Sequence, residues 1–238
     1  KIDLVEAVGG SATYGMYAYS AGGPVSVLTG TGGSVTGNLT GVYAQTAGTS
    51  LIDTVLVHTQ NAITGNTGDG IDAFGVNGLI RVDTDAFVTG AINGVDAIAD
   101  PMASGNAEID VNVNAGANGT SGYGVYASTQ GGIEHVDTYG DVSGGTGIEA
   151  HDTTSDVNIF VHTGNVSGTG ASGEGIYGQT SAGANVFITT LSGTNVSSTQ
   201  DDGIEGVTSL GGNITIDSSS NVTAGNNGGD DAITGIVS

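Results

Sequence analysis

The chain has 238 residues, of which 24 are acidic and only two, Lys1 and Arg81, are basic, so its formal charge is −22. Nucleic acids and anionic lipids are bound mainly through Lys and Arg, so this composition excludes nucleic acid as an expected partner. Cysteine is absent and no apolar run is long enough to span a bilayer, so we expect neither a disulfide framework nor direct membrane insertion.

A four-residue phrase recurs along the whole chain and sets a period of about 27 residues. It consists of a glycine, an aliphatic residue, a tyrosine or an acid, and then Ala or Gly. Its eight glycines are Gly15, Gly41, Gly70, Gly94, Gly124, Gly147, Gly175 and Gly203. Each phrase predicts one short strand, because the apolar residues alternate.

Two more strands are expected between successive phrases, in a constant order. The first is an alternating apolar run, found at 25–29, 55–59, 80–84, 109–113, 135–138, 159–163, 186–190 and 214–218. The second is shorter and lies at 34–37, 62–65, 87–90, 141–144, 165–168 and 221–224. Turns rich in Gly, Asn, Asp and Ser separate them, so each unit contains three strands.

Stacking is the way in which units of this size bury their apolar side chains. We therefore predict an all-β fold, a single-stranded, right-handed parallel β-helix solenoid with three short strands per coil and about 8–9 coils. Propeller blades and shorter-period solenoids do not fit the spacing, and so much glycine opposes helical repeats. The prediction is a single domain over residues 1–238, an excised or mature segment of a longer chain.

Strand alternation assigns side chains to the inside or the outside of the coil. The aliphatic residue of each phrase is expected inside, as are the threonines that end the second strand, including Thr163. Threonine hydroxyls in one buried column are expected to bond to each other or to turn carbonyls. The glycines at strand ends are expected to supply positive φ at the corners.

One outward column emerges from the same alternation and is the predicted binding surface. Tyrosines beside acids are common on faces that hold sugars or proteins. The column consists of Tyr17, Tyr43, Asp72, Asp96, Tyr126, Glu149, Tyr177 and Glu205. Asp72 and Asp96 are expected on successive coils, where their mutual repulsion raises one pKa.

Metal binding is considered at two acid-rich turns. Residues 228–235 resemble one copy of the calcium-binding nonapeptide of repeat-in-toxin proteins, and residues 66–72 are a weaker copy. The candidate ligands are Asp69, Asp72, Asp96, Asp230 and Asp231. Neither motif recurs at nine-residue spacing, so two readings stay open: no cofactor, or Ca²⁺ held by carboxylates and backbone carbonyls.

An enzymatic role is not predicted. His58 and His162 are expected in the same column several coils apart, too distant to share a zinc ion. The segment 200–203 weakly resembles the acidic motif of polygalacturonase-like glycosidases, but its basic companions are missing.

The repeat phrases, the alternating valine strands and the Asn-Val-Ser-Gly segments together resemble the passenger region of bacterial autotransporters and related large secreted adhesins. The resemblance implies an extracellular or outer-membrane surface location on a bacterium, and a role in adhesion, aggregation or biofilm. The expected function is a rod-like spacer or a self-associating, filament- or matrix-forming module. Its expected partners are copies of itself, other surface proteins or polysaccharide. The alternative is a carbohydrate-binding or polysaccharide-processing β-helix of the tailspike or polysaccharidase type.

Overall fold

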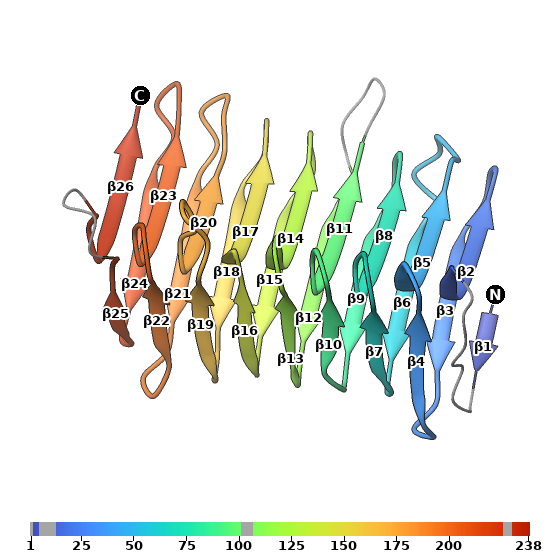
Figure 1. The fold of residues 1–238 in the computed structure, drawn as a ribbon. Helices are drawn as coiled ribbons and strands as arrows, with labels where there is room; N and C mark the ends of the chain where they lie inside the picture. Colours follow the sequence, from blue (N-terminus) through green and yellow to red (C-terminus); the bar gives the residue numbers. More distant parts are fainter. Residues whose placement is uncertain (1, 5–12, 101–106, 226–229) are drawn as a thin grey trace.

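The structure is a computed structural model, and it describes residues 2–4, 13–100, 107–225 and 230–238. Those residues form strands and turns, with no helix among them. The strands wind into a β-solenoid of about eight turns, in which the chain advances steadily from one end to the other (Figure 1). The predicted fold class is confirmed.

Three parallel sheets form the walls of the solenoid, and every strand pairs with its equivalents in the preceding and following coils. Sheet A contains β1 (Ile2–Leu4), β3 (Val25–Thr29), β6 (Val55–Thr59), β9 (Ile80–Thr84), β12 (Ile109–Val113), β15 (Glu134–Thr138), β18 (Val157–Val161), β21 (Val186–Thr190) and β24 (Ile214–Ser218).

Sheet B consists of the shorter strands of each unit. They are β4 (Ser34–Gly37), β7 (Ala62–Gly65), β10 (Val88–Gly90), β13 (Gly116–Gly119), β16 (Asp141–Gly144), β19 (Asn165–Gly168), β22 (Asn195–Ser198) and β25 (Asn221–Thr223).

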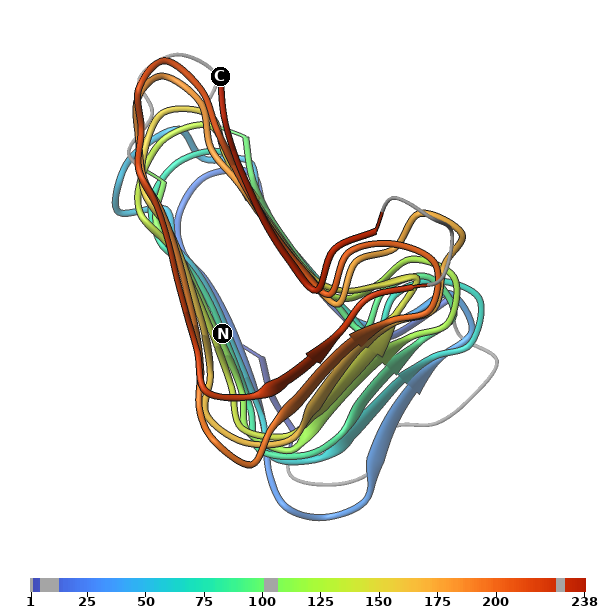
Figure 2. The ribbon, with the colours of Figure 1, turned by 90° about the vertical axis from the view of Figure 1, so that its left-hand side faces the viewer.

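Sheet C is built from the repeated phrases. Its strands are β2 (Tyr14–Ser20), β5 (Thr40–Thr46), β8 (Ile71–Gly75), β11 (Val95–Ala99), β14 (Tyr123–Thr129), β17 (Thr146–Asp152), β20 (Ile176–Gln179), β23 (Ile204–Thr208) and β26 (Ile233–Val237). Viewed along the axis, sheets A and C lie opposite each other and sheet B meets them at an angle (Figure 2).

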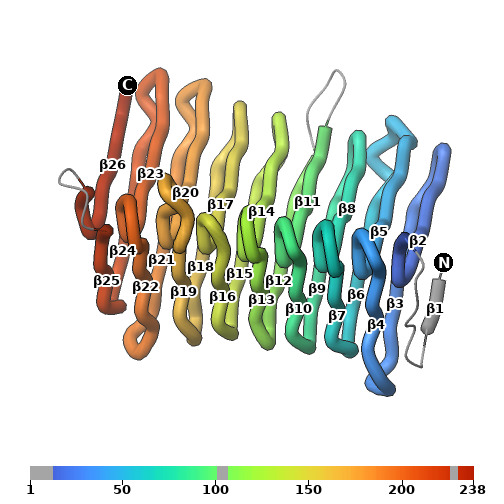
Figure 3. Tube along the Cα trace, viewed as in Figure 1, coloured from blue at the N-terminus to red at the C-terminus, as the bar shows by residue number. Residues whose placement is uncertain are grey.

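The core is a set of aliphatic columns that run along the axis. The inward residues of sheet C are all buried, as predicted: Met16, Val42, Ile71, Val95, Val125, Ile148, Ile176 and Ile204. Valine and isoleucine suit this position because β-branched side chains pack well on a pleated surface. The trace of the chain shows how closely the coils repeat one another along the rod (Figure 3).

The repeated glycines have a different role from the one predicted. None of the eight has a positive φ; the positive-φ glycines are others, such as Gly33 and Gly78. A Cβ on Gly41 would lie 2.6 Å from the carbonyl oxygen of Gly70, and a Cβ on Gly70 would lie 2.6 Å from that of Gly94. Each glycine is therefore required because the next coil leaves no room for a side chain.

The sequence assignment of one strand was wrong by two residues. β18 spans Val157–Val161, and Phe160 rather than His162 pairs with Asp137 in the outward column. Consequently Thr163 is exposed instead of inward, and His162 does not share a column with His58. Alternation continues from Val157 to Thr163, so both frames keep Ile159 and Val161 inside and differ only in whether Val157 or Thr163 is the third inward residue.

The predicted threonine bonding is only partly correct. Thr190 Oγ1 bonds to Ser218 Oγ and Ser220 Oγ, both at 2.8 Å. The hydroxyls of Thr59, Thr84 and Thr138 are buried, and no hydrogen-bond partner is found for them among the described residues.

Candidate functional site

The outward face of sheet C carries the predicted binding surface, which we call the outer ladder. Strand register places its eight residues in one continuous column, in the predicted order: Tyr17, Tyr43, Asp72, Asp96, Tyr126, Glu149, Tyr177 and Glu205. Tyr17 is half exposed, whereas the other seven are partly buried by their neighbours. This partial burial was not predicted, because alternation alone indicates only the direction of a side chain.

A second outward column lies beside the outer ladder and was missed in the sequence. It is formed by the residue that precedes each repeated glycine and by Asp231, which precedes Ala232 at the equivalent position. Its members are Tyr14, Thr40, Asp69, Asn93, Tyr123, Thr146, Glu174, Asp202 and Asp231, of which Thr40, Asn93, Thr146 and Asp202 are buried. The glycine interrupts the alternation, so residues three apart lie on the same side. The rings of Tyr14 and Tyr17 confirm this, with centroids 5.1 Å apart.

Tyrosines cluster at the N-terminal end of the outer ladder. The rings of Tyr17 and Tyr43 are stacked with centroids 5.2 Å apart and an interplanar angle of 3°. Tyr14 leans against both of them. A surface hollow of about 480 Å³ adjoins this cluster and is lined by Tyr17, Tyr19 and Pro24 among others. Flat aromatic rings of this kind stack well on apolar faces of ligands.

Three aspartates form an acidic cluster in the middle of the ladder. Asp72 and Asp96 are register partners, and Asp69 lies in the neighbouring column. Burial, followed by the charge of Asp69, raises the pKa of Asp72 to about 6. Burial and the charges of Asp69 and Asp72 raise the pKa of Asp96 to about 7, although the Asn93 amide donates to its Oδ2 at 2.9 Å. The predicted repulsion between neighbouring aspartates is therefore present.

A glutamate cluster follows toward the C-terminal end. Burial and the charge of Glu174 raise the pKa values of Glu149 and Glu205 to about 7. Burial, followed by the charge of Glu149, raises the pKa of Tyr123 to about 12. Among the described residues, no base is found to offset the burial of these carboxyls, so a large part of the ladder is uncharged just below neutral pH.

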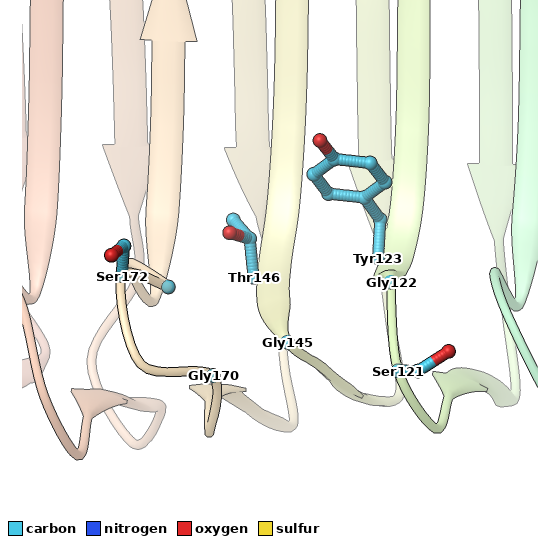
Figure 4. Close-up of a pocket in the computed structure, with 8 residues that line it drawn as sticks. Ser121, Gly122, Tyr123, Gly145, Thr146, Gly170 and Ser172 are labelled. Carbon is cyan, nitrogen blue, oxygen red and sulfur yellow. The ribbon is translucent and has the colours of Figure 1, made fainter.

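A shallow hollow adjoins this second cluster. It has a volume of about 220 Å³ and is lined by Ser121, Gly122, Tyr123, Gly145, Thr146, Gly170, Ser172 and Gly173. Figure 4 shows the Tyr123 ring and the Thr146 hydroxyl along its sheet C side. Thr146 Oγ1 donates to Glu174 Oε2 at 3.3 Å. The hollow thus offers the hydroxyl groups of Ser121, Thr146 and Ser172 beside an aromatic ring, a set of polar groups that suits a hydroxyl-rich ligand.

The five candidate metal ligands are not brought to one place. Asp69, Asp72 and Asp96 are neighbours, whereas Asp231 lies several coils away, where its backbone N–H donates to Asp202 Oδ1 at 2.7 Å. Gly228 and Gly229 of the nonapeptide-like segment lie outside the described residues. Within the described ranges, no group of three or more His, Asp or Glu side chains is arranged to hold a metal ion.

Three of the four histidines, His58, His135 and His162, lie on sheet A or next to it, whereas His151 lies in β17 of sheet C. His58 Nε2 is 3.4 Å from Asp85 Oδ2, and His162 Nε2 is 3.0 Å from Asp137 Oδ1. The ring of His162 also stacks on Tyr139 and Phe160, with centroids 4.0 Å away in each case. Each of these two histidines thus has its own aspartate, and the two do not form a shared site.

Comparisons with protein-family models, with curated proteins and with solved structures give no match for this chain. No helix in the described ranges is long and apolar enough to cross a membrane.

Proposed function

We propose that this chain is a structural rod of an extracellular bacterial surface protein of the autotransporter-passenger type, and that it self-associates side by side through the outer ladder. The observation that carries the proposal is the ladder itself, one continuous face of tyrosines and partly buried acids on sheet C. The acidic composition and the absence of cysteine support the extracellular location.

The charge of the ladder determines when such a face is able to pack against a copy. At alkaline pH, Asp72, Asp96, Glu149 and Glu205 are ionised and two ladders repel each other. Their pKa values of about 6 to about 7 mean that protonation removes this charge on mild acidification. The exposed tyrosine rings then remain available to bury apolar area between two rods.

Sedimentation velocity at several concentrations tests the proposal. We expect single rods at about pH 8 and laterally associated rods at about pH 5, because the ladder loses its charge between these values. The triple variant Asp96→Asn, Glu149→Gln, Glu205→Gln is expected to associate already at about pH 8.

The matched control removes the same number of charges from the opposite wall. Asp83, Asp110 and Asp137 lie on the outward face of sheet A. Their replacement by asparagine removes three negative charges, as many as the ladder variant removes, but leaves the ladder intact. Association at about pH 8 is therefore not expected. Equal association of both triple variants would show a general charge effect, and a wild-type chain that stays single at both pH values would refute the proposal.

A second candidate function is polysaccharide binding along the same face. The tyrosine cluster of Tyr14, Tyr17 and Tyr43 favours it, because aromatic side chains beside a surface hollow suit the apolar faces of sugar rings. The hollow beside Tyr123 adds hydrogen-bonding groups. We rank it second, since the hollows on this face are shallow.

A further inference from the structure

A glutamate occupies a position in the core that is aliphatic in the other coils. Glu134 opens β15 and is register partner of Ile109 in β12 and of Val157 in β18. All three residues are fully buried. Neither carboxyl oxygen of Glu134 has a hydrogen-bond partner among the described residues. Buried polar atoms in native structures are nearly always paired, so this exception requires an explanation.

A second buried carboxyl, that of Asp152 on sheet C, lies at the same corner of the coil. The turn that follows Asp152 bonds to the start of β15, because the Glu134 N–H donates to Asp156 O at 3.2 Å and the Gly132 N–H donates to Ser155 Oγ at 3.0 Å. Asp152 ends β17 with no exposed surface, and its charge is the strongest that acts on Glu134. Asp152 Oδ1 accepts from the backbone N–H groups of Thr154 and Ser155 at 2.6 and 2.8 Å. Asp152 Oδ2 is buried and lacks a partner within the described ranges.

The other groups around Glu134 do not neutralise it. Glu149 of β17 adds a further negative charge, and the Tyr126 hydroxyl of β14 also interacts with Glu134. Thr129, the register partner of Asp152, is already engaged because its hydroxyl donates to Ala107 O at 3.1 Å. From β18, Asn158 bonds only to the backbone oxygen of Glu134.

The titratable side chains next to Glu134 on sheet A point away from it. His135 and Asp137 in β15 and Asp110 in β12 belong to the outward face, where His135 and Asp110 are register partners. His151 of β17 and Asp156 act on the Asp152 carboxyl with opposite effects on its pKa, and His151 does so from the outward face of sheet C. No base is found inside the coil near Glu134 among the described residues. An ionised Glu134 would be a second buried anion beside Asp152, which the core opposes strongly.

We propose that Glu134 and Asp152 form an internal proton-binding site, in which protonated Glu134 donates its O–H to Asp152 Oδ2. One proton then satisfies two of the three unpartnered carboxyl oxygens, and Asp152 keeps the negative charge that the two backbone N–H groups stabilise. Removal of that proton by hydroxide leaves two carboxylates in the core. The site thus makes the middle of the rod sensitive to alkali.

The sign of the effect follows from the direction of the shift. Burial, then Asp152, then Glu149 raise the pKa of Glu134 well above its usual value. A folded chain that holds this proton after the unfolded chain has lost it becomes less stable as pH rises. Between the pKa of Glu134 in the unfolded chain and its pKa in the folded chain, each pH unit raises the unfolding equilibrium constant about tenfold for this one proton.

Denaturant unfolding between about pH 8 and about pH 9 tests the site, because the ladder acids, with pKa values up to about 7, are then largely ionised, while tyrosines of the unfolded chain, with an ordinary pKa of about 10, are still mostly protonated. The wild-type unfolding constant is expected to rise with pH over this range. Glu134→Gln retains a neutral side chain of the same shape and should abolish the rise. Glu149→Gln removes an acid from the same neighbourhood but on the outward face, and should retain a clear rise.

Infrared spectroscopy at about pH 8 provides a second measurement that needs only the folded wild type. A carbonyl stretch of a protonated carboxylic acid is expected, and it should be absent in Glu134→Gln if that variant folds. Three results would overturn the proposal: a wild-type constant independent of pH, an unchanged rise in Glu134→Gln, or stabilisation by Ca²⁺ that depends on Glu134. The last result would identify a cation as the ligand in place of the proton.

Discussion

At the scale of single residues, the acids of the outer ladder make the protein more stable in mild acid than at neutral pH. A carboxyl whose pKa is raised on folding stabilises fully below its unfolded pKa, and this stabilisation is lost as pH rises through the folded pKa. For Asp96 the window runs from about 4 to about 7. Asp96→Asn should therefore be more stable than wild type at about pH 7, on the order of 1–3 kcal/mol, since one pKa unit corresponds to about 1.4 kcal/mol.

The same variant at about pH 3 is its own control, because the aspartate is then mostly protonated in both the folded and the unfolded chain, as neutral as asparagine. Urea unfolding at the two pH values gives the comparison. Equal destabilisation of Asp96→Asn at both values would mean that its hydrogen bond with Asn93, rather than charge, dominates at this position.

The direction in which a side chain points could be predicted from the sequence, whereas the extent of its burial could not. The outer ladder followed from alternation alone. The inward direction of Glu134 could also be predicted from alternation, because it lies two residues before the inward Val136. The strand that it opens matches the repeat only loosely, so the predicted strand began one residue later. The extent of burial on the outer face, which raises the pKa values, depends on neighbouring coils and cannot be read from one strand.

At the scale of the strand and turn, the repeated glycine is a steric requirement of stacking. Gly70→Ala would place a Cβ against the Val88 side chain and 2.6 Å from the Gly94 carbonyl oxygen. Because the backbone of the next coil cannot move away without loss of its ladder bonds, we expect a destabilisation of about 1–3 kcal/mol. Denaturant midpoints measure the loss.

Gly22→Ala is the matched control for this glycine variant. Its Cβ would have no heavy atom within 4 Å, and its φ is not positive. The change should therefore stay within about 0.5 kcal/mol of wild type. A similar loss of stability in both variants would mean that backbone flexibility, and not the space between coils, explains why glycine recurs at this position of the repeat.

The order and type of the strands were predictable because the period of two and the repeat of about 27 residues agree with each other. The exact frame of β18 was not predictable, since Ile159 and Val161 face inward whether the strand begins at Val157 or at Ile159. The role of the glycines was also misjudged, because the distance between coils is a property of the stack and leaves no mark in a single unit.

At the scale of the whole molecule, the last coil differs from the others at one informative position. Ala232 stands where earlier coils have the repeated glycine, since Ile233 is register partner of Ile204. Its Cβ projects where a coil stacked in the same register would place a backbone oxygen. Lateral contact along the outer ladder, which runs through the described coils from Tyr17 to Glu205, is the route to self-association that we propose.

The central claim is that residues about one period apart in sequence are neighbours in space. The most direct test is a set of electron–electron distance measurements between pairs of spin labels on single cysteines, which the cysteine-free chain allows. Leu28, Thr189 and Asp217 share one outward column of sheet A, with six register steps from Leu28 to Thr189 and seven to Asp217. At about 4.8 Å per coil, the backbone separations should be about 29 and about 34 Å, with narrow distributions. Broad distributions, or a distance from Leu28 that fails to increase by about one strand spacing between Thr189 and Asp217, would contradict the stacked-coil architecture.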